Sequence, residues 1–197
     1  EILSETGLFE YVAIKAAQTV RGNPVALLVL LSGVTALFSA FLDNVTTILL
    51  IAPVTIFIAD QMNLNPIPFI LSEVWASNIG GTATLIGDPP NILIGSAANL
   101  SFMEFIIHLG PVIFVIFLVM ALNIVLLFDR KMSVSQDLKV KIMEMVPRRA
   151  IKDPLTMKMG LAVLGAVITG FLTHHLTGLE PATIALSGAV ILMMIRK

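Results

Sequence analysis

Two short polar segments interrupt long apolar runs, and their side chains could bind an ion. The first, called the tip here, is residues 43–47 (DNVTT), inside an apolar run from Val25 to Ala59. The second, the glycine-rich segment, is residues 80–91 (GGTATLIGDPPN). Lipid cannot satisfy free N–H and C=O groups, so irregular backbone at membrane depth persists only where protein buries it or where it lines a transport cavity. The two segments therefore predict a transport site.

Each segment carries one carboxylate, Asp43 or Asp88, and placing an Asp at the centre of a transmembrane helix costs ~2.5–3.5 kcal/mol unless it has partners. Neighbouring hydroxyls, amides and glycine carbonyls offer hard oxygen ligands, which suit Na⁺ or protons. The predicted ion- or substrate-binding residues are Asp43, Asn44, Thr46, Thr47, Ser77, Asn78, Gly80, Gly81, Thr82, Thr84, Gly87, Asp88 and Asn91, with Na⁺ at Asn44, Gly80 and Asp88.

Structural interpretations of the same residues stay open. Asp43 could cap a helix by accepting hydrogen bonds from its first N–H groups, and the Gly-Pro cluster could be only a kink. Glu73, two turns before the glycine-rich segment, is a partner of the site, a proton carrier or a side chain that reaches the membrane interface. The segment is not a nucleotide-binding loop, because it lacks both the Lys-Ser/Thr ending of a P-loop and the G-x-G-x-x-G spacing.

The composition places the chain in a bilayer. Of 197 residues, 57% are apolar and 13% are charged, against roughly a quarter charged in an average soluble domain. With no cysteine, disulfides and thiolate metal sites are excluded. The net charge of −1 predicts no nucleic-acid partner. No pattern of a hydrolytic triad or zinc cluster is present, so we expect neither an enzyme nor a cofactor other than a coupling Na⁺ or H⁺.

The expected fold is all-α and polytopic. Residues 1–21 form an interfacial helix or the truncated end of a transmembrane helix. Residues 22–128 form a core with three parts: a re-entrant hairpin over 25–60, a discontinuous helix over 67–98 and a span over 102–128. The hairpin is favoured because its returning arm, Ile48 to Ala59, contains Pro53 and falls short of the ~20 residues of a full span. Residues 156–176 and 181–195 predict two more spans.

Charge sets the expected orientation. Eight of the twelve Lys and Arg residues lie between positions 130 and 158, so residues 129–155 are predicted to be a cytoplasmic loop. Asp129-Arg130-Lys131 and Arg196-Lys197 would anchor spans on that side.

Residues 36–47 (ALFSAFLDNVTT) and 76–91 (ASNIGGTATLIGDPPN) closely resemble the ion transporter superfamily of arsenite, sodium/proton and citrate-transporter-like permeases. Within it they are most similar to the branch related to the melanocyte P protein. The likeness also takes in residues 7–11 and the last two helices. It implies an inverted-repeat transporter that works by elevator-type alternating access, usually as a homodimer. In relatives of the dicarboxylate symporter type, a Ser-Asn-Thr tip and an unwound glycine-rich helix bind Na⁺ and a substrate carboxylate, which implies these roles for Asn44, Thr46 and residues 80–91.

Two departures from that pattern matter. This chain has Asp43 where those symporters have a neutral Ser, and an anionic tip favours a cation or proton over a carboxylate. No second Asn-Thr or Gly-Gly-Thr motif follows residue 91. We therefore interpret the chain as the N-terminal half of the transporter plus the start of its second repeat, residues 156–197, which alone would not complete a transport cycle.

Three functions follow as hypotheses. The favoured one is a sodium- or proton-coupled secondary transporter, with cation/proton antiport preferred. An alternative within transport is an anion permease for arsenite or a di- or tricarboxylate. A third, of another class, is a non-transporting membrane scaffold or regulatory half-transporter. The expected partners are a small inorganic ion or anion, the lipid bilayer and a second copy of the full-length protein. The expected location is a prokaryotic inner membrane.

Overall fold

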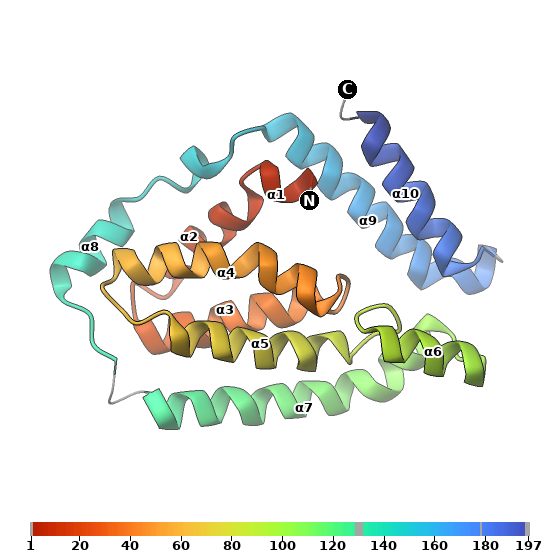
Figure 1. Cartoon of the computed structure of the whole chain (residues 1–197), viewed down its shortest axis with the longest axis horizontal. Helices are drawn as coiled ribbons and strands as arrows, with labels where there is room; N and C mark the ends of the chain where they lie inside the picture. The colour runs from red at the N-terminus through yellow and green to blue at the C-terminus, as the bar shows by residue number, and fades with distance from the viewer. Residues whose placement is uncertain (1, 129–131, 178, 196–197) are drawn as a thin grey trace.

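The computed structural model describes residues 2–128, 132–177 and 179–195, and every regular element in these ranges is a helix (Figure 1). The fold is therefore all-α, as predicted. The helices are α1 (Ile2–Glu5), α2 (Leu8–Thr19), α3 (Pro24–Ser39), α4 (Asn44–Gln61), α5 (Ile67–Gly81), α6 (Pro89–Ala98), α7 (Phe102–Phe128), α8 (Gln136–Glu144), the 3₁₀ helix η1 (Pro147–Ala150), α9 (Pro154–Thr177) and α10 (Pro181–Ile195).

Helices α3 and α5 form the centre of the molecule and lie side by side (Figure 1). Helix α3 begins with Asn23, whose side chain accepts a hydrogen bond from the Ala26 N–H at 3.0 Å, as an N-cap does. Gly80 allows the close approach of the two helices, because a Cβ there would overlap the backbone of Ala36. The buried centre of this pair holds Leu27, Leu28, Leu31, Phe69 and Ala76.

The N-terminal stretch, expected as one interfacial or truncated helix, is divided in two. Gly7 has φ 82° and a Cβ there would overlap the carbonyl of Ala150, so a glycine is required between α1 and α2. Helix α2 is part of the core: Phe9 and Ala17 are buried, and the Phe9 ring lies 5.3 Å from that of Phe38. Its apolar face therefore packs against other helices of this chain.

The returning arm of the 25–60 hairpin is longer than its expected bounds of Ile48 to Ala59. Helix α4 begins at Asn44, since tip residues 44–47 form its first turn, and it continues through Pro53 to Gln61. At 1.5 Å per residue its 18 residues reach ~27 Å, close to the thickness of the hydrocarbon core. The argument from a short arm is thus corrected, and re-entry of the hairpin stays a prediction.

The discontinuous helix over 67–98 consists of α5 and α6, with irregular backbone at residues 82–88 between them. Pro89 and Pro90 occupy the first turn of α6, where a missing N–H has no helical partner to lose. Helix α6 ends at Asn99, which adopts the left-handed conformation with φ 52°.

The predicted loop 129–155 is ordered where it is described. It contains α8 and η1, and the Gln18 side-chain amide of α2 donates hydrogen bonds to the carbonyls of Ile142 at 3.2 Å and Met145 at 2.7 Å. The Lys152 N–H donates to the Thr6 carbonyl at 2.9 Å. The loop therefore lies along α1 and α2. The predicted anchors Asp129-Arg130-Lys131 and Arg196-Lys197 lie outside the described residues.

Helices α9 and α10 cover the residue ranges of the two predicted C-terminal spans and pack against each other, although within the described residues only α9 contains a stretch long and apolar enough to cross a membrane. Gly170 of α9 faces Ile184 of α10, and Gly188 faces Val167, so small residues let the two helices approach closely. A hollow of about 1220 Å³ lies between this pair and the start of α4, residues 85–86 and α6.

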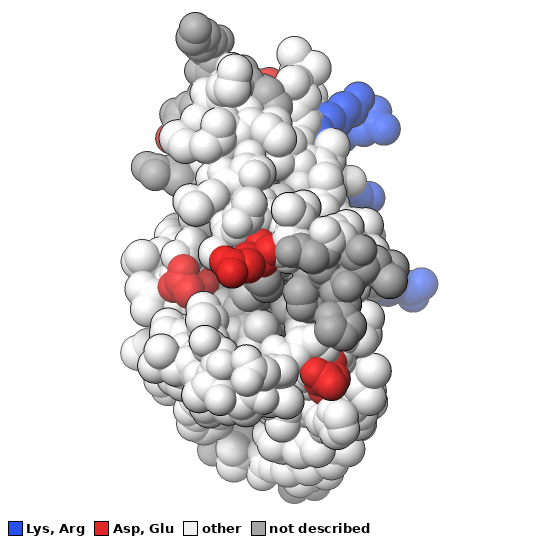
Figure 2. Space-filling view, turned by 90° about the vertical axis from the view of Figure 1, so that its right-hand side faces the viewer, with Lys and Arg blue, Asp and Glu red and all other residues white. Residues whose placement is uncertain are grey.

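Three helical stretches of the described chain are long and apolar enough to cross a membrane: α4, α7 and residues 154–173 of α9. Their outer surfaces are apolar, as at Leu126 of α7, which is 74% exposed. Figure 2 shows a face on which uncharged residues predominate and the Lys and Arg side chains lie at one edge. Apolar surface on this scale is stable in contact with lipid.

Candidate functional site

The tip begins with an aspartate that caps a helix. Asp43 has extended backbone (φ −67°, ψ 155°), and its Oδ1 accepts a hydrogen bond from the Thr46 N–H at 3.0 Å. The capping interpretation is therefore observed for Asp43, whose side chain is exposed. Its carboxylate places negative charge at the start of α4.

Asn44 connects the tip to the end of α5. Its Oδ1 accepts a hydrogen bond from the Ser39 hydroxyl at 2.6 Å, and its Nδ2 donates to Asn78 Oδ1 at 3.2 Å. The Ser77 hydroxyl donates to the Asn44 carbonyl at 3.4 Å. Three predicted residues, Asn44, Ser77 and Asn78, are thus brought together.

Two glycines let oxygen atoms converge beside Asn44. A Cβ at Gly81 would overlap Asn44 Oδ1 and would lie 2.9 Å from the Gly87 carbonyl oxygen. A Cβ at Gly87 would overlap the Gly81 carbonyl oxygen and would lie 2.7 Å from that of Ser39. We call this group, formed by Ser39, Asn44, Gly81 and Gly87, the oxygen cradle. Its oxygens are neutral carbonyl and amide groups, the kind of ligand that hard cations take. The Gly81 carbonyl also accepts from Asn91 Nδ2 and Asn44 Oδ1 from the Ser39 hydroxyl.

Side chains hold residues 82–88 in place. The Thr84 hydroxyl donates to the Ala40 carbonyl and accepts from the Gly87 N–H at 3.1 Å. Asn91 Nδ2 donates to the carbonyls of Gly81 at 3.2 Å and Thr84 at 2.8 Å. Both Thr84 and Asn91 are buried, so buried side chains satisfy part of the irregular backbone, as burial at membrane depth requires.

Four helix ends meet at the cradle. The carbonyl ends of α3 and α5 carry partial negative charge, and the N-terminal ends of α4 and α6 carry partial positive charge. Asp43 and Asp88 are the N-cap residues of α4 and α6, so each carboxylate offsets a positive helix end. Asp88 makes no side-chain capping hydrogen bond and is half-buried.

The remaining predicted residues have other positions. Gly80 lies against α3, and its carbonyl already accepts from the Ala83 N–H at 3.0 Å, so it is not free as expected. The Thr82 hydroxyl donates back to the Asn78 carbonyl at 2.8 Å. The Thr46 N–H donates to the Asp43 cap. Thr47 is fully buried, and no described residue is a hydrogen-bond partner of its hydroxyl.

Glu73 lies apart from the cradle, in the middle of α5. It is fully buried, and the Thr55 hydroxyl of α4 donates a hydrogen bond to its Oε1 at 2.6 Å. A position at the membrane interface, one of the three interpretations above, does not fit this burial. Glu73 Oε2 has no hydrogen-bond partner among the described residues.

Sequence reasoning missed Ser39 and Thr55, which hold Asn44 and Glu73. Both are single hydroxyls within apolar helices, and both are fully buried. For Ser39 the sequence does contain a signal in the helical spacing, because Ser32, Thr35 and Ser39 lie on one face of α3.

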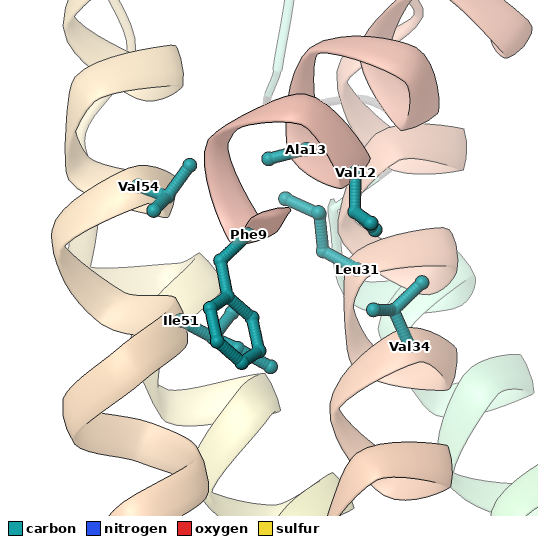
Figure 3. Close-up of a pocket in the computed structure, with 7 residues that line it drawn as sticks. All are labelled: Phe9, Val12, Ala13, Leu31, Val34, Ile51 and Val54. Atoms are coloured by element: carbon teal, nitrogen blue, oxygen red, sulfur yellow. The ribbon is translucent and has the colours of Figure 1, made fainter. Parts of the chain in front are cut away.

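A small pocket elsewhere has no polar lining. Figure 3 shows it between α2, α3 and α4, with apolar side chains pointing into it. Its volume is about 10 Å³, about that of one water probe, and a water needs polar partners. It is a packing gap. The lining residues are Phe9, Val12, Ala13, Leu31, Val34, Ile51 and Val54.

Comparison with known proteins supplies the family. Residues 1–197 match the family CitMHS, described as citrate transporter. The 46 kDa membrane protein of Mycobacterium leprae (strain TN) is 44% identical over 197 residues, which are 100% of this chain and 46% of that protein. The uncharacterized transporter Rv2684 of Mycobacterium tuberculosis (strain ATCC 25618 / H37Rv) is 44% identical over 195 residues, 98% of this chain and 45% of that protein.

The likeness to the P protein branch is also found. The P protein of Homo sapiens is 50% identical over 99 residues, 50% of this chain and 12% of that protein. The chain spans about half the length of the mycobacterial relatives it matches.

Proposed function

This chain belongs to the citrate transporter family CitMHS, and on that premise we propose that it contributes one ion-binding half of a secondary active transporter coupled to Na⁺ or H⁺. The family and the apolar helices make it part of an integral membrane protein. We further propose cation/proton antiport, a homodimer of the full-length protein, and a prokaryotic inner membrane, for which the mycobacterial relatives are the support.

The oxygen cradle is the observation that carries the proposal. Uncharged oxygens from Ser39, Asn44, Gly81 and Gly87 converge where no side chain fits, and two carboxylates, Asp43 and Asp88, stand at the neighbouring helix starts. Negative charge over neutral oxygen ligands favours a small hard cation. Asp43 and Asn44 belong to the tip and Asp88 to the glycine-rich segment, so both predicted segments contribute.

The decisive experiment uses the full-length protein in proteoliposomes that contain a pH-sensitive dye. Na⁺, Li⁺, arsenite and citrate are supplied in turn, and we expect proton flux with Na⁺ or Li⁺. Asp43→Asn keeps a capping oxygen but removes the charge, and we expect it to weaken the cation dependence of the flux. Unchanged cation-dependent flux in this variant would overturn antiport at this site. Asp137→Asn, in the exposed first turn of α8, is the matched control.

One observation favours an anion permease as the second candidate. Helices α4 and α6 both begin next to the cradle, and the N-terminal end of a helix attracts anions. This candidate predicts arsenite- or citrate-dependent flux that Asp43→Asn strengthens, because a repelling charge is removed. Absence of flux with all four solutes, in protein that folds, would instead favour the scaffold or regulatory half-transporter.

A further inference from the structure

The buried carboxyl of Glu73 has a role that the oxygen cradle does not explain. Glu73 is 0% exposed, and its hydrogen bond with Thr55 leaves Oε2 without a partner among the described residues. Natural proteins leave few buried polar atoms unpaired, and such atoms call for an explanation such as a functional proton or an entering water.

The helices packed against α5 place no Lys or Arg beside this carboxyl within the described residues. Helix α5 packs against α3, α4 and α7. Helix α3 contains no charged residue, α4 contains only Asp60, and α7 contains Glu104 and His108. All three of these side chains are exposed, so none shares the burial of Glu73. What α3 and α4 do place in the buried interior is hydroxyls.

Two of those hydroxyls are also unpaired. Within the part of the chain that the structure describes, Ser32 Oγ on α3 and Thr47 Oγ1 on α4 are buried without a hydrogen-bond partner, as is Glu73 Oε2 on α5. Three adjoining helices therefore each carry one unsatisfied oxygen. Oxygens of this kind can receive water when the helices separate.

An ionised carboxylate in this setting would lack a counter-charge and would keep only one hydrogen bond, which is strongly unfavourable in an apolar interior. The neutral acid avoids that cost. Membrane carboxyls that face a bundle interior in this way are typical of proton relays. As long as α4 and α5 are packed together around Glu73, this carboxyl therefore has to be protonated.

We propose that Glu73 carries the proton that drives transport, with Thr55 as its positioning residue. When α4 and α5 separate, the Glu73 O–H bond breaks, the proton passes to water, and water and the Thr55 hydroxyl stabilise the carboxylate. When Glu73 takes a proton from water again, α4 and α5 can return to their packed state. The proposal rests on ion-coupled transport as the function of the protein.

The cradle and Glu73 are physically connected. Ser77 lies one helical turn after Glu73 on the same face of α5, and its hydroxyl contacts the Ser39 hydroxyl at 3.5 Å and the Asn44 carbonyl at 3.4 Å. A cation bound by Asn44 in the cradle therefore acts on the α4–α5 contact that encloses Glu73. Occupation of the cradle and protonation of Glu73 become linked through this contact.

The test uses Glu73→Gln in the full-length protein, because Gln is neutral and still offers an oxygen to Thr55. In proteoliposomes, we expect ²²Na⁺/Na⁺ exchange to persist and Na⁺-driven proton flux to be lost. Thr55→Val should shift the pH profile of the flux without abolishing it. Glu144→Gln, on the exposed surface of α8, should leave both readouts unchanged. Proton flux at the wild-type level in Glu73→Gln would overturn the proposal.

A second measurement does not depend on transport. Infrared spectra of the wild-type protein at neutral pH should contain the carbonyl stretch of a protonated carboxylic acid, and Glu73→Gln should lack it. Absence of that band in the wild type would overturn the proposal even if Na⁺ transport is found. Presence of the band without any Na⁺-driven proton flux would refute sodium/proton antiport while supporting the protonated Glu73.

Discussion

The turn that leads into α4 and the backbone that leads into α6 place an aspartate at the same kind of helix start but hold it differently. Asp43 is bonded to the Thr46 N–H, so its carboxylate is a structural part of α4. Asp88 makes no capping bond; its carbonyl accepts from the Asn91 N–H at 3.0 Å, and the N–H of the preceding Gly87 donates to the Thr84 hydroxyl. One charge is fixed by the helix it caps, whereas the other is left available to a ligand.

The largest expected effect concerns Gly87. Gly87→Ala places a methyl group against the Gly81 and Ser39 carbonyls. We expect the overpacking to lower the free energy of unfolding by about 1–3 kcal/mol and the cation-dependent flux to be lost. Thermal unfolding of the purified protein measures the first effect. The matched control is Gly165→Ala in α9, where nothing lies within 4 Å of the added Cβ. The Gly165→Ala control should stabilise α9 by about 0.5–1 kcal/mol. If both variants instead lost stability and flux to a similar extent, the role of Gly87 in the cradle would be contradicted.

The second largest effect is expected for Ser39. Ser39→Ala removes the hydroxyl that donates to Asn44 Oδ1, and loss of this partly buried hydrogen bond lowers the free energy of unfolding by about 0.5–1.5 kcal/mol. We expect a lower unfolding temperature and weaker cation dependence. Ser187→Ala, whose hydroxyl is on the exposed side of α10 and bonds only within that helix, should change neither. If the cation dependence of Ser39→Ala matches that of the wild type, the cradle does not need Asn44 held in this position.

The comparison between the two aspartates is tested directly by alanine. Asp43→Ala should destabilise the protein by about 1 kcal/mol through loss of the cap, and Asp43→Asn should not, since Asn caps equally well. Asp88→Ala should leave the unfolding temperature unchanged but weaken cation dependence. Equal destabilisation by the two alanine variants would show that Asp88 also serves as a cap.

The smallest expected effect on stability is at Asp153, which serves as a reference for a helix-capping aspartate in the predicted loop 129–155. It precedes α9 as Asp43 precedes α4, and its Oδ1 accepts from the N–H groups of Thr156 at 3.0 Å and Leu155 at 3.1 Å. Hydrogen bonds from Thr156, side chain first and then backbone, and from the Leu155 backbone lower the pKa of Asp153 below its usual value. A depressed folded-state pKa contributes stability above the unfolded pKa of ~3.9, and the contribution is lost as the pH falls through the folded value.

We therefore expect Asp153→Asn to flatten the acid limb of the stability–pH curve slightly, as measured by thermal unfolding. The effect is small because the side chain is exposed. Lys158→Gln, an exposed change on α9, serves as the control that leaves the acid limb intact. An unaltered acid limb in Asp153→Asn would contradict this origin.

Local signals predicted the interruptions, because polar residues and Gly-Pro clusters within apolar runs mark a change of backbone whatever surrounds them. The same signals misplaced the start of α4. Asn44 to Thr47 look like a loop by polarity, yet polar residues in a first turn are what capping favours. Polarity alone does not distinguish a loop from a capped helix start.

The roles of individual glycines and hydroxyls could not be predicted, because they depend on another helix. Gly80 and Gly81 are adjacent in sequence, but one lies against the backbone of α3 and the other faces Asn44 and Gly87. Thr55 resembles any small residue of an apolar helix until α5 brings Glu73 beside it. Such assignments need the packing geometry, which one sequence does not contain.

The contacts of Gln18 have a consequence for biogenesis. Its amide bonds reach the carbonyl of Ile142 across a sequence separation of 124 residues. During synthesis, α2 therefore emerges long before the segment that holds it, while α3, α4 and α5 already have one another as neighbours. The central helices can assemble first, and α2 docks fully only after α8 has left the ribosome. Helix α2 is thus made before α3, α4 and α5, yet it completes its contacts after they can complete theirs.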